Sequence, residues 1–576
     1  MKRSKNLLIT TIILICLNSC VSKRASMPDI VRIWDGNTSE LKGYFESRAE
    51  IDFTGGIWDM DGRYTIGIKE ENGFLVGIII NSAYDDWLPN MVKFKTLKHN
   101  SVIRTAWIMR DHSVIIYDEP ILHGNNTLII PTLDRRLGSI RLQRLSPAFP
   151  MDFSRDATYF VEMVEAVHPI FILEGMLPDN YDELRAEFLN ETSKPIYHTE
   201  FQLAAARYRV ALRDGHMNTL DIILNLEKGI DLSLIYDAGR LFFAENNDVE
   251  VIEIGDVPVS DIIHQIERHH YFENVSMRSL DIPRFVRFEL ILRLAGAEIN
   301  ENNRVIITLN HSNQISEVEF ELIGGISTAI RLERRDYIIR HEIKNDIFYI
   351  SLSRFVDGEH ITEVAEEIAR AVENGIWRFI VDVRGNPGGN ANVGLRLAEA
   401  MGVGVPTPGV IQRISDLALQ EQFNNMSLRQ LRRRFRLMSF FMPNRMPFGD
   451  ISVKTDRIVL QPSTKTQNPN NVFVSVLTDK VTFSAATGIG YGIQDGNLGN
   501  VIGEPSRNAP NSFANMIYFR LPESRTRARI SSTYYMRPNT DADPNTLVPD
   551  IMVSADRALE VAIEYLSTLE RPEQKP

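Results

Sequence analysis

From about residue 345 onward, apolar runs typical of buried strands alternate with stretches of helical spacing, and this alternation constrains the fold more than any other feature. The runs IFYISLSRF, RFIVDVRG and NVFVSVLTDK are each followed by a helical stretch, and an irregular, Arg-rich insertion at 405–468 interrupts the series. Strands and helices in this order are typical of an α/β domain with a parallel sheet. We therefore expect an α/β core at 336–566.

The sequence before this core divides into further parts. Alternating apolar and polar residues with hairpin-type turns predict an antiparallel, β-rich domain at 51–150. Helical spacing predicts a helical domain at 151–228, which carries the DGH motif. At 229–335, the stretch VIEIGDVPVSDII resembles the strand–turn–helix element of PDZ-like modules, whose exposed sheet edge accepts a peptide as an added strand. The length of 576 residues agrees with several domains.

The first twenty residues differ in character from the rest. MKRSKNLLITTIILICLNSC has basic residues followed by an apolar stretch from Leu7 to Leu17, which is too short to span a bilayer and predicts a signal peptide at 1–20. The letters LNSC resemble a bacterial lipobox, which implies cleavage before Cys20 and lipidation of its thiol; the alternative is a plain signal peptide cut nearby. We expect an extracytoplasmic lipoprotein anchored to a membrane through Cys20, with 21–50 as a tether.

Charge and cysteine content exclude several classes of function. The formal net charge of −12 gives nucleic-acid binding no global electrostatic support. The two cysteines, Cys16 and Cys20, both lie in the signal segment, so the mature fold has no disulfide, cysteine nucleophile or thiolate metal site. Loss of Lys2, Arg3 and Lys5 with the signal takes the charge from −12 to −15, which disfavours flat binding to an anionic membrane.

The loop IVDVRGNPGGN follows a predicted buried strand and precedes a predicted helix. Its glycines Gly385, Gly388 and Gly389 allow backbone N–H groups to point outward beside the positive end of the helix. Such groups can hold a developing oxyanion. The alternative is a tight turn that needs glycine for its geometry alone.

Ser484 stands at the corresponding point of a second strand–turn–helix stretch, NVFVSVLTDKVTFSAATGIG. A serine at a helix start is most often an N-cap. If the two strands are parallel, however, both turns lie at one edge of the sheet, and Ser484 lies near the amides of Gly388 and Gly389, as a nucleophile would. His216 is a candidate base, although a lone histidine is usually structural and a separation of 268 residues does not show that the two meet.

Taken together, the stretches DGHM, DVRGNPGG, TFSAAT and VIGEPSRNAPNSF resemble the tail-specific, or C-terminal-processing, serine peptidase family. The resemblance covers about 150–565 and is strongest from 375 to 555. It implies a crotonase-like α/β superhelix core, as in ClpP, and a serine endopeptidase that hydrolyses polypeptides at an extracytoplasmic membrane surface.

The family uses two kinds of base, and this sequence distinguishes between them. One branch has a Ser–Lys dyad, with the lysine a short distance after the serine, but the only lysine after Ser484 is Lys575 in the C-terminal tail. The other branch, which resembles the core of the tricorn protease, has a Ser–His–acid arrangement. Its DGHT-like motif matches the residues around His216, and its acid precedes a VxPD sequence, matched by DADPNTLVPD. The resemblance implies Asp543 as the acid, with Asp541 second; the alternative is a solvated acidic loop.

The resemblance also implies a mechanism. His216 takes the proton from Ser484 as the serine attacks a peptide carbonyl. The oxyanion is held by the backbone N–H of Gly388 or Gly389 and that of Ala485, and water hydrolyses the acyl-enzyme. We expect no cofactor and no metal, since the histidines form no H-E-x-x-H pattern.

Three positions depart from the family pattern. Thr487 replaces an acidic residue after SAA, and GEPSRN has Ser506 and Arg507 where threonine and glycine are common. Arg507 could crowd the oxyanion or bind a substrate carboxylate. The alternative function is therefore a catalytically inactive, peptidase-like lipoprotein that binds a peptide or apolar ligand. The presence of serine, histidine and acid together favours the enzyme.

Overall fold

The computed structural model describes most of the chain between residues 55 and 571. The gaps after 55 are 61–62, 85, 100–101, 110–111, 118–121, 125–126, 131–139, 147–149, 225–227, 247, 325–338, 345, 419–428, 431–450, 454–455 and 525, and before 55 only isolated residues between 33 and 45 are described. The predicted signal peptide, Cys20 and most of the Arg-rich insertion lie outside the described residues.

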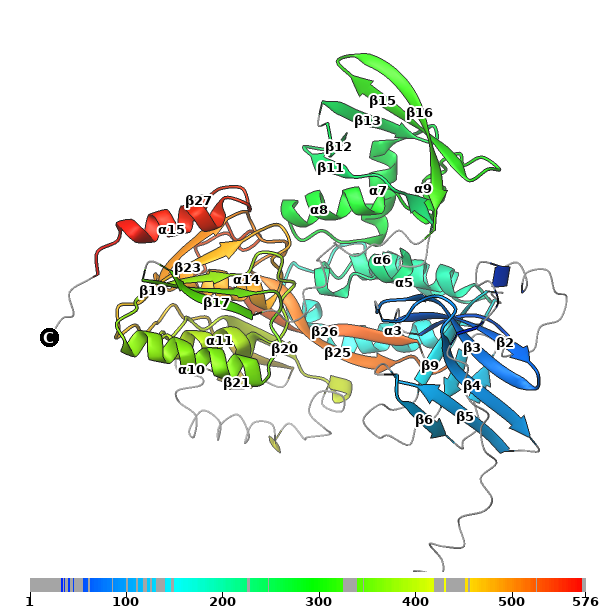
Figure 1. Ribbon diagram of the computed structural model, residues 1–576, viewed down its shortest axis with the longest axis horizontal. Helices are drawn as coiled ribbons and strands as arrows, with labels where there is room; N and C mark the ends of the chain where they lie inside the picture. Colours follow the sequence, from blue (N-terminus) through cyan, green and yellow to red (C-terminus); the bar gives the residue numbers. More distant parts are fainter. Residues whose placement is uncertain are drawn as a thin grey trace, which may run out of the picture. The chain divides into compact units, whose positions relative to one another are not determined.

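Met1–Phe149 form the first of two compact units. Its strands make one nine-stranded antiparallel sheet in the order β6-β5-β4-β3-β2-β1-β9-β8-β7 (Figure 1). The strands are β1 (Gly56–Met60), β2 (Tyr64–Glu71), β3 (Phe74–Ser82), β4 (Val92–His99), β5 (Val102–Ile108), β6 (Val114–Tyr117), β7 (Leu122–Gly124), β8 (Thr127–Ile130) and β9 (Ile140–Ser146). The antiparallel strands that the sequence predicts in this region are therefore present.

Pro150–Pro576 form the second unit, whose centre is a six-stranded sheet in the order β17-β18-β19-β23-β24-β27. Its strands are β17 (Ile339–Lys344), β18 (Ile347–Leu352), β19 (Arg378–Asp382), β23 (Phe473–Thr478), β24 (Gly499–Gly503) and β27 (Ile551–Met552). Only the β17–β18 pair is antiparallel. Because β19 and β23 are parallel neighbours, the turns that follow them lie at the same edge of the sheet.

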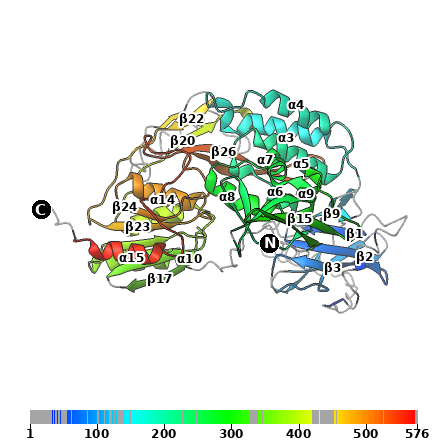
Figure 2. The same cartoon turned by 90° about the horizontal axis from the view of Figure 1, so that it is seen from above.

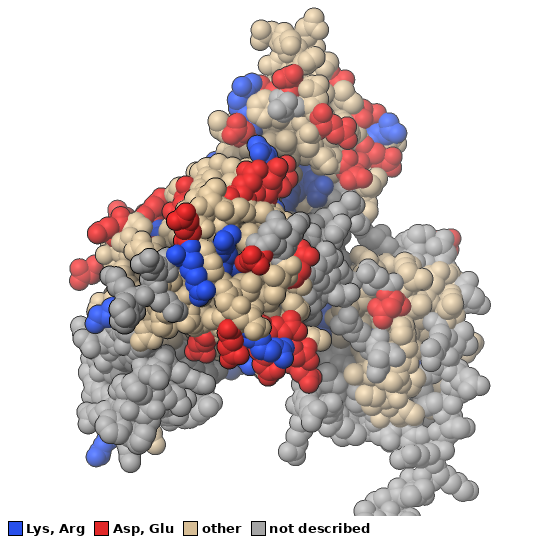
Figure 3. Space-filling view, turned by 60° about the vertical axis from the view of Figure 1, so that its left-hand side comes forward, with Lys and Arg blue, Asp and Glu red and all other residues tan. Residues whose placement is uncertain are grey.

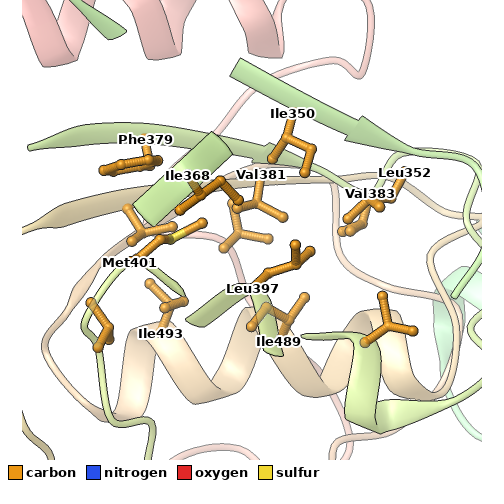
Figure 4. Packing of buried hydrophobic residues seen from close by; sticks show 14 of the residues in the cluster. Ile350, Leu352, Ile368, Phe379, Val381, Val383, Leu397, Met401, Ile489 and Ile493 are labelled. Atoms are coloured by element: carbon orange, nitrogen blue, oxygen red, sulfur yellow. The ribbon is translucent and has the colours of Figure 1, made fainter. Parts of the chain in front are cut away.

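Helices cover both faces of this sheet. They are α10 (Glu359–Glu373), α11 (Ala391–Ala400), α14 (Ala485–Asp495) and α15 (Ala558–Thr568). Successive side chains of a strand point to opposite faces. Val381 therefore packs in the cluster with α10, α11 and α14, whereas Ile380 packs in the cluster with α15. Figure 4 shows the first cluster, with Leu397 of α11 and Ile489 of α14 below the strands.

The helical segment shares a hydrophobic core with a second sheet. Its helices are α3 (Ser154–Val167), η1 (Pro169–Ile172), α4 (Tyr181–Glu191), α5 (His198–Val210), η2 (Gly215–Met217) and α6 (Leu220–Leu224). The sheet has the order β21-β22-β20-β26-β25, formed by β20 (Gly409–Arg413), β21 (Ile451–Val453), β22 (Arg457–Leu460), β25 (Ser512–Arg520) and β26 (Arg527–Met536). Phe160 and Phe519 are both part of the shared core, and Figures 1 and 2 show β26 beside α3.

Residues 229–323 form a third sheet with helices of its own. The sheet has the order β10-β16-β15-β13-β12-β11, with β14 paired to β13. The elements are β10 (Gly229–Ile230), β11 (Leu234–Asp237), β12 (Arg240–Phe243), β13 (Val249–Ile254), β14 (Val257–Pro258), α7 (Val259–His269), α8 (Val275–Phe285), α9 (Glu289–Ala295), β15 (Arg304–His311) and β16 (Gln314–Ile323). They pack around a separate hydrophobic cluster that includes Ile262 and Phe285.

The surface carries both signs of charge. On the face drawn in Figure 3, Asp and Glu side chains gather in groups and Lys and Arg are less frequent, in keeping with the formal net charge of −12. None of the helices in the described ranges is long and apolar enough to cross a membrane.

A core substitution tests the packing of α11 on the central sheet. Leu397 is 1% exposed in the core cluster, whereas Leu395 of the same helix is 46% exposed. We expect Leu397→Ala to lower the free energy of unfolding by about 2–5 kcal/mol, because it removes buried methyl groups and leaves a cavity. Leu395→Ala should change it by less than about 0.5 kcal/mol. Urea unfolding followed by circular dichroism measures both, and equal effects would contradict this packing.

Candidate active site

Ser484 lies in the turn between β23 and α14, in a conformation that non-glycine residues rarely adopt. Its φ and ψ are 56° and −123°, and its hydroxyl makes no capping hydrogen bond although the residue holds the N-cap position. Such a backbone costs about 1–3 kcal/mol and persists only where its surroundings enforce it. The surroundings here include Asn508, whose Oδ1 accepts the Ser484 amide at 2.7 Å. The turn therefore holds the hydroxyl away from its own helix.

His216 reaches this hydroxyl from a distant part of the chain. It lies in the short helix η2, which packs against β25 and β26. Its Nε2 is 3.0 Å from Oγ of Ser484 across 268 positions of sequence, and its ring lies against Phe483, with centroids 4.6 Å apart. The structure thus brings together the two residues whose meeting the sequence spacing could not show.

Burial lowers the pKa of His216 to about 4, with the charges of Arg529 and Arg507 acting in the same direction and that of Asp214 opposing them. The imidazole is therefore neutral at physiological pH and its Nε2 can accept the serine proton. In that arrangement Nδ1 carries the ring hydrogen. Nδ1 is buried and has no hydrogen-bond partner among the described residues.

Asp214 fixes the backbone of the His216 turn. Its Oδ1 accepts the amide of His216 at 2.8 Å, and its Oδ2 lies 3.2 Å from Nε2 of His168. The His168 Nδ1 accepts the amide of Ile170, so Nε2 bears the hydrogen and donates it to Asp214. Burial raises the pKa of Asp214, but the hydrogen bond from His168 and the neighbouring imidazoles outweigh it and lower the pKa below its usual value.

Glu273 comes from the loop between α7 and α8 and lies beside the same turn. Its Oε1 accepts the amide of Gly215 and its Oε2 that of Ala509, both at 2.9 Å. Burial raises the pKa of Glu273 to about 8, against the opposing effect of the two amides. Atoms of Asp214, His216 and Glu273 lie within 4.8 Å of one another, close enough to hold a metal ion, although the carboxylate oxygens already accept N–H donors.

The predicted acids lie in an exposed loop. The Asp543 carboxylate accepts the amides of Asn545 at 2.8 Å and Thr546 at 3.3 Å, both within its own turn. Asp541 is also exposed. The carboxylates that the structure groups with the His216 ring are those of Asp214 and Glu273. No sequence signal pointed to Glu273, which lies in the predicted PDZ-like module.

The glycine loop lies directly against the serine turn. A Cβ on Gly388 would stand 2.6 Å from the carbonyl oxygen of Phe483 and 2.7 Å from Cβ of Ser484, and φ is 91°. Only glycine fits at this position. The Gly388 amide itself donates to Oδ1 of Asn386 at 2.7 Å.

Two other amides stand beside this contact. Ala485 is the first residue of α14, so its N–H has no acceptor inside the helix. Its nitrogen is 3.1 Å from where a Gly388 Cβ would stand. Gly389 follows with φ of 136°, and a Cβ there would stand 2.0 Å from the carbonyl oxygen of Phe355. Of the predicted oxyanion residues, Gly388 and Ala485 therefore lie at the serine turn, and Gly389 packs against Phe355.

Of the three unusual positions of the sequence, Thr487 and Arg507 have partners close to the site. Thr487 donates its hydroxyl to Oδ1 of Asn508 at 2.6 Å, the same atom that accepts the Ser484 amide. Arg507 donates to both carboxylate oxygens of Asp281 in α8, at 2.8 and 2.6 Å. The guanidinium that the sequence analysis considered for an oxyanion or a substrate carboxylate is thus paired with a buried aspartate.

Comparison with known proteins finds a family resemblance for the segment that contains Ser484. Residues 346–553 match the model of peptidase family S41. A search of curated proteins found no match. Among solved structures, mature CPAF is 11% identical over 72% of this chain and 95% of its own, with a TM-score of 0.46. A putative peptidase from Parabacteroides merdae is 13% identical (73% and 99% covered, TM-score 0.35), and the tricorn protease is 12% identical (88% and 45%, TM-score 0.26). The predicted resemblance to a serine peptidase family is therefore confirmed for the segment 346–553, which contains Ser484.

Proposed function

We propose that this chain is a serine endopeptidase that hydrolyses polypeptides, with Ser484 as nucleophile and His216 as general base. The observation that carries the proposal is the 3.0 Å contact between Oγ of Ser484 and Nε2 of a neutral, buried His216. A nucleophile and a base within hydrogen-bond reach are the minimum that acyl transfer requires. The family match of the segment around the serine agrees with this chemistry.

The reaction follows from the positions of these groups. His216 accepts the hydroxyl proton while Oγ of Ser484 bonds to the carbonyl carbon of the scissile peptide. The amides of Ala485 and Gly389 donate to the oxyanion; the amide of Gly388 can contribute if it leaves Asn386. The tetrahedral intermediate then breaks the C–N bond, and the imidazolium gives its proton to the leaving amine. Water, deprotonated by the same imidazole, releases the acyl group.

The contact between Ser484 and His216 does not identify the acid that supports His216. The family resemblance implies Asp543, and this stays a prediction. Its carboxylate would have to leave the amides of its own loop to reach the imidazole. Asp214 already contributes a charge that favours the imidazolium.

Two domain identities belong to the same proposal. The six-stranded sheet with helices on both faces agrees with a crotonase-like core at 336–566. The antiparallel sheet and helix α7 agree with a PDZ-like module at 229–335. An unpaired strand edge of such a module can take up a polypeptide as an added strand, which suits a peptidase substrate.

The location is proposed from the sequence alone. The lipobox-like LNSC after an apolar stretch supports cleavage before Cys20 and attachment of lipid to its thiol. A lipid on Cys20 would hold the peptidase at an extracytoplasmic membrane surface. Treatment of cells with an inhibitor of lipoprotein processing should then leave the full-length precursor.

Covalent labelling tests the nucleophile and the base. We expect a fluorophosphonate probe to label the full-length protein in detergent, Ser484→Ala to abolish labelling, and His216→Ala to slow it at least ~100-fold, because a general base contributes about 10²–10⁴-fold. Ser567→Ala is the matched control, since Oγ of Ser567 bonds only to a carbonyl of its own exposed helix. Labelling of Ser484→Ala at the wild-type rate would show that another serine reacts. A folded wild type without labelling would favour the inactive, ligand-binding protein.

The pH dependence of labelling tests the state of the base. Because burial lowers the pKa of His216 to about 4, the imidazole gains a proton only below that pH. As the pH is lowered from 5.5, we expect the labelling rate to fall with a midpoint near pH 4. Recovery of the rate after return to pH 7 controls for acid unfolding. A midpoint between 6 and 7 would show an imidazole that is solvated rather than buried.

A further inference from the structure

We propose that Glu273 is the carboxyl that positions His216 and stabilises its charged form, a role that rests on the proposed serine peptidase function. The site already described uses Ser484, His216 and backbone amides, and leaves the acid open. Glu273 belongs to the segment between α7 and α8, outside the matched family segment 346–553. The catalytic constellation would then be completed by the module at 229–323.

The first argument is the bridge that Glu273 makes. One carboxylate oxygen accepts the amide of Gly215, the residue before His216, and the other accepts the amide of Ala509, the residue after Asn508. Asn508 in turn holds the backbone of the nucleophile. A single side chain therefore ties the turn of the base to the loop that supports the serine. The two hydrogen bonds restrain both loops, and they become stronger when Glu273 ionises.

The second argument is the closeness of the fit. A Cβ on Gly215 would stand 2.5 Å from Oε1 of Glu273, so the carboxyl can reach this turn only because the residue before the base is glycine. The DGH motif thus supplies an aspartate that binds the turn from one side and a glycine that admits Glu273 from the other.

The third argument is that Nδ1 of the imidazole has no hydrogen-bond acceptor among the described residues. When His216 accepts the serine proton it becomes an imidazolium, whose Nδ1–H requires an acceptor or a nearby negative charge. Nδ1 is buried without a hydrogen-bond partner among the described residues. The oxygens of Asp214 accept the His216 amide and the His168 ring, and those of Glu273 accept two backbone amides, so either carboxyl acts on Nδ1 through its charge. Glu273 is the other carboxyl within the 4.8 Å cluster.

The segment that carries Glu273 is itself fixed. Asn274 donates its side-chain amide to the carbonyl of Ser506, and Asp281 of α8 receives both hydrogen bonds from Arg507. Both partners belong to the loop that contains Asn508. Contacts of the residues that follow Glu273 therefore help to hold it against the site.

The charge of Glu273 depends on pH within the working range of an enzyme. Burial raises its pKa to about 8, and the groups that face it are Asp214, which raises the pKa further, Arg507, which lowers it, and the phenols of Tyr271 and Tyr534. As pH rises through 8, Glu273 ionises and its negative charge favours the imidazolium of His216. The base becomes stronger, so the rate of serine acylation should rise.

The experiment measures the pH profile of fluorophosphonate labelling from pH 6 to 10 on the full-length protein. We expect the wild-type rate to rise through a midpoint near pH 8, and Glu273→Gln to lose this rise and to label at least tenfold more slowly at pH 9. Glu273→Asp should restore the midpoint in part, because it keeps the titrating carboxyl. Glu267→Gln, the same substitution at a carboxylate of α7 paired with Arg278, should keep the wild-type profile.

Several results would overturn the proposal. Glu273→Gln with a wild-type profile would do so, as would a uniform loss of rate that leaves the midpoint at pH 8, which indicates a structural role only. If Asp543→Asn loses the midpoint at pH 8 and Glu273→Gln keeps it, the acid that supports His216 is Asp543, as the family resemblance implies.

A second measurement separates this inference from the proposed function. The ¹⁵N resonances of the His216 ring, assigned by comparison with His216→Ala, should shift with a midpoint near pH 8 in the wild type and not in Glu273→Gln. This holds even if the protein labels with no probe, a result that would contradict the peptidase alone. A His216 ring that does not respond to Glu273 would contradict the inference whether or not the protein labels. If Glu273→Gln does not fold, the same titration of Glu273→Asp decides, since a shorter side chain should weaken the shift.

Discussion

The active-site geometry depends on one shared hydrophobic core. The helices of 154–210 and the long strands β25 and β26 bury their apolar side chains against one another, so that two parts of the chain more than 300 residues apart fold as one body. The short helix with His216 packs on the same two strands. Strand β25 begins shortly after Asn508, whose side chain accepts the hydrogen bond of the Ser484 amide. Apolar burial between these helices and strands thus determines where His216 and Ser484 meet.

Around this core, the polar groups of the site are buried in pairs rather than solvated. Asp214 is hydrogen-bonded to His168, and Asp281 to His270 and Arg507; the two aspartates and the two histidines are almost inaccessible to solvent. A buried charge is tolerated only with such partners, and removal of one partner leaves the other unpaired at a high cost. The low dielectric of the same region explains why an imidazole loses basicity while a nearby glutamic acid holds its proton.

The sequence could predict what local patterns encode. Strand–turn–helix repeats predicted the parallel sheet, and parallel pairing predicted that the glycine loop would meet the serine turn, as the contact of Gly388 with Ser484 shows. The partnership with His216 came from the resemblance, because no periodicity reports a contact across 268 residues. The position of Glu273 beside His216 could not be predicted, since it depends on how residues 229–323 pack against the His216 turn. The loop of Asp543 has the expected motif, but its hydrogen bonds satisfy its own turn.

Thr487 and Arg507, which depart from the family pattern, make hydrogen bonds that support the structure of the site. Thr487 and the Ser484 amide donate to one oxygen of Asn508, so the threonine fixes the side chain that enforces the strained backbone of the nucleophile. Arg507 binds Asp281 with two hydrogen bonds, and that contact fastens the neighbouring module where Glu273 enters. The two substitutions therefore support the same site that the serine and histidine form.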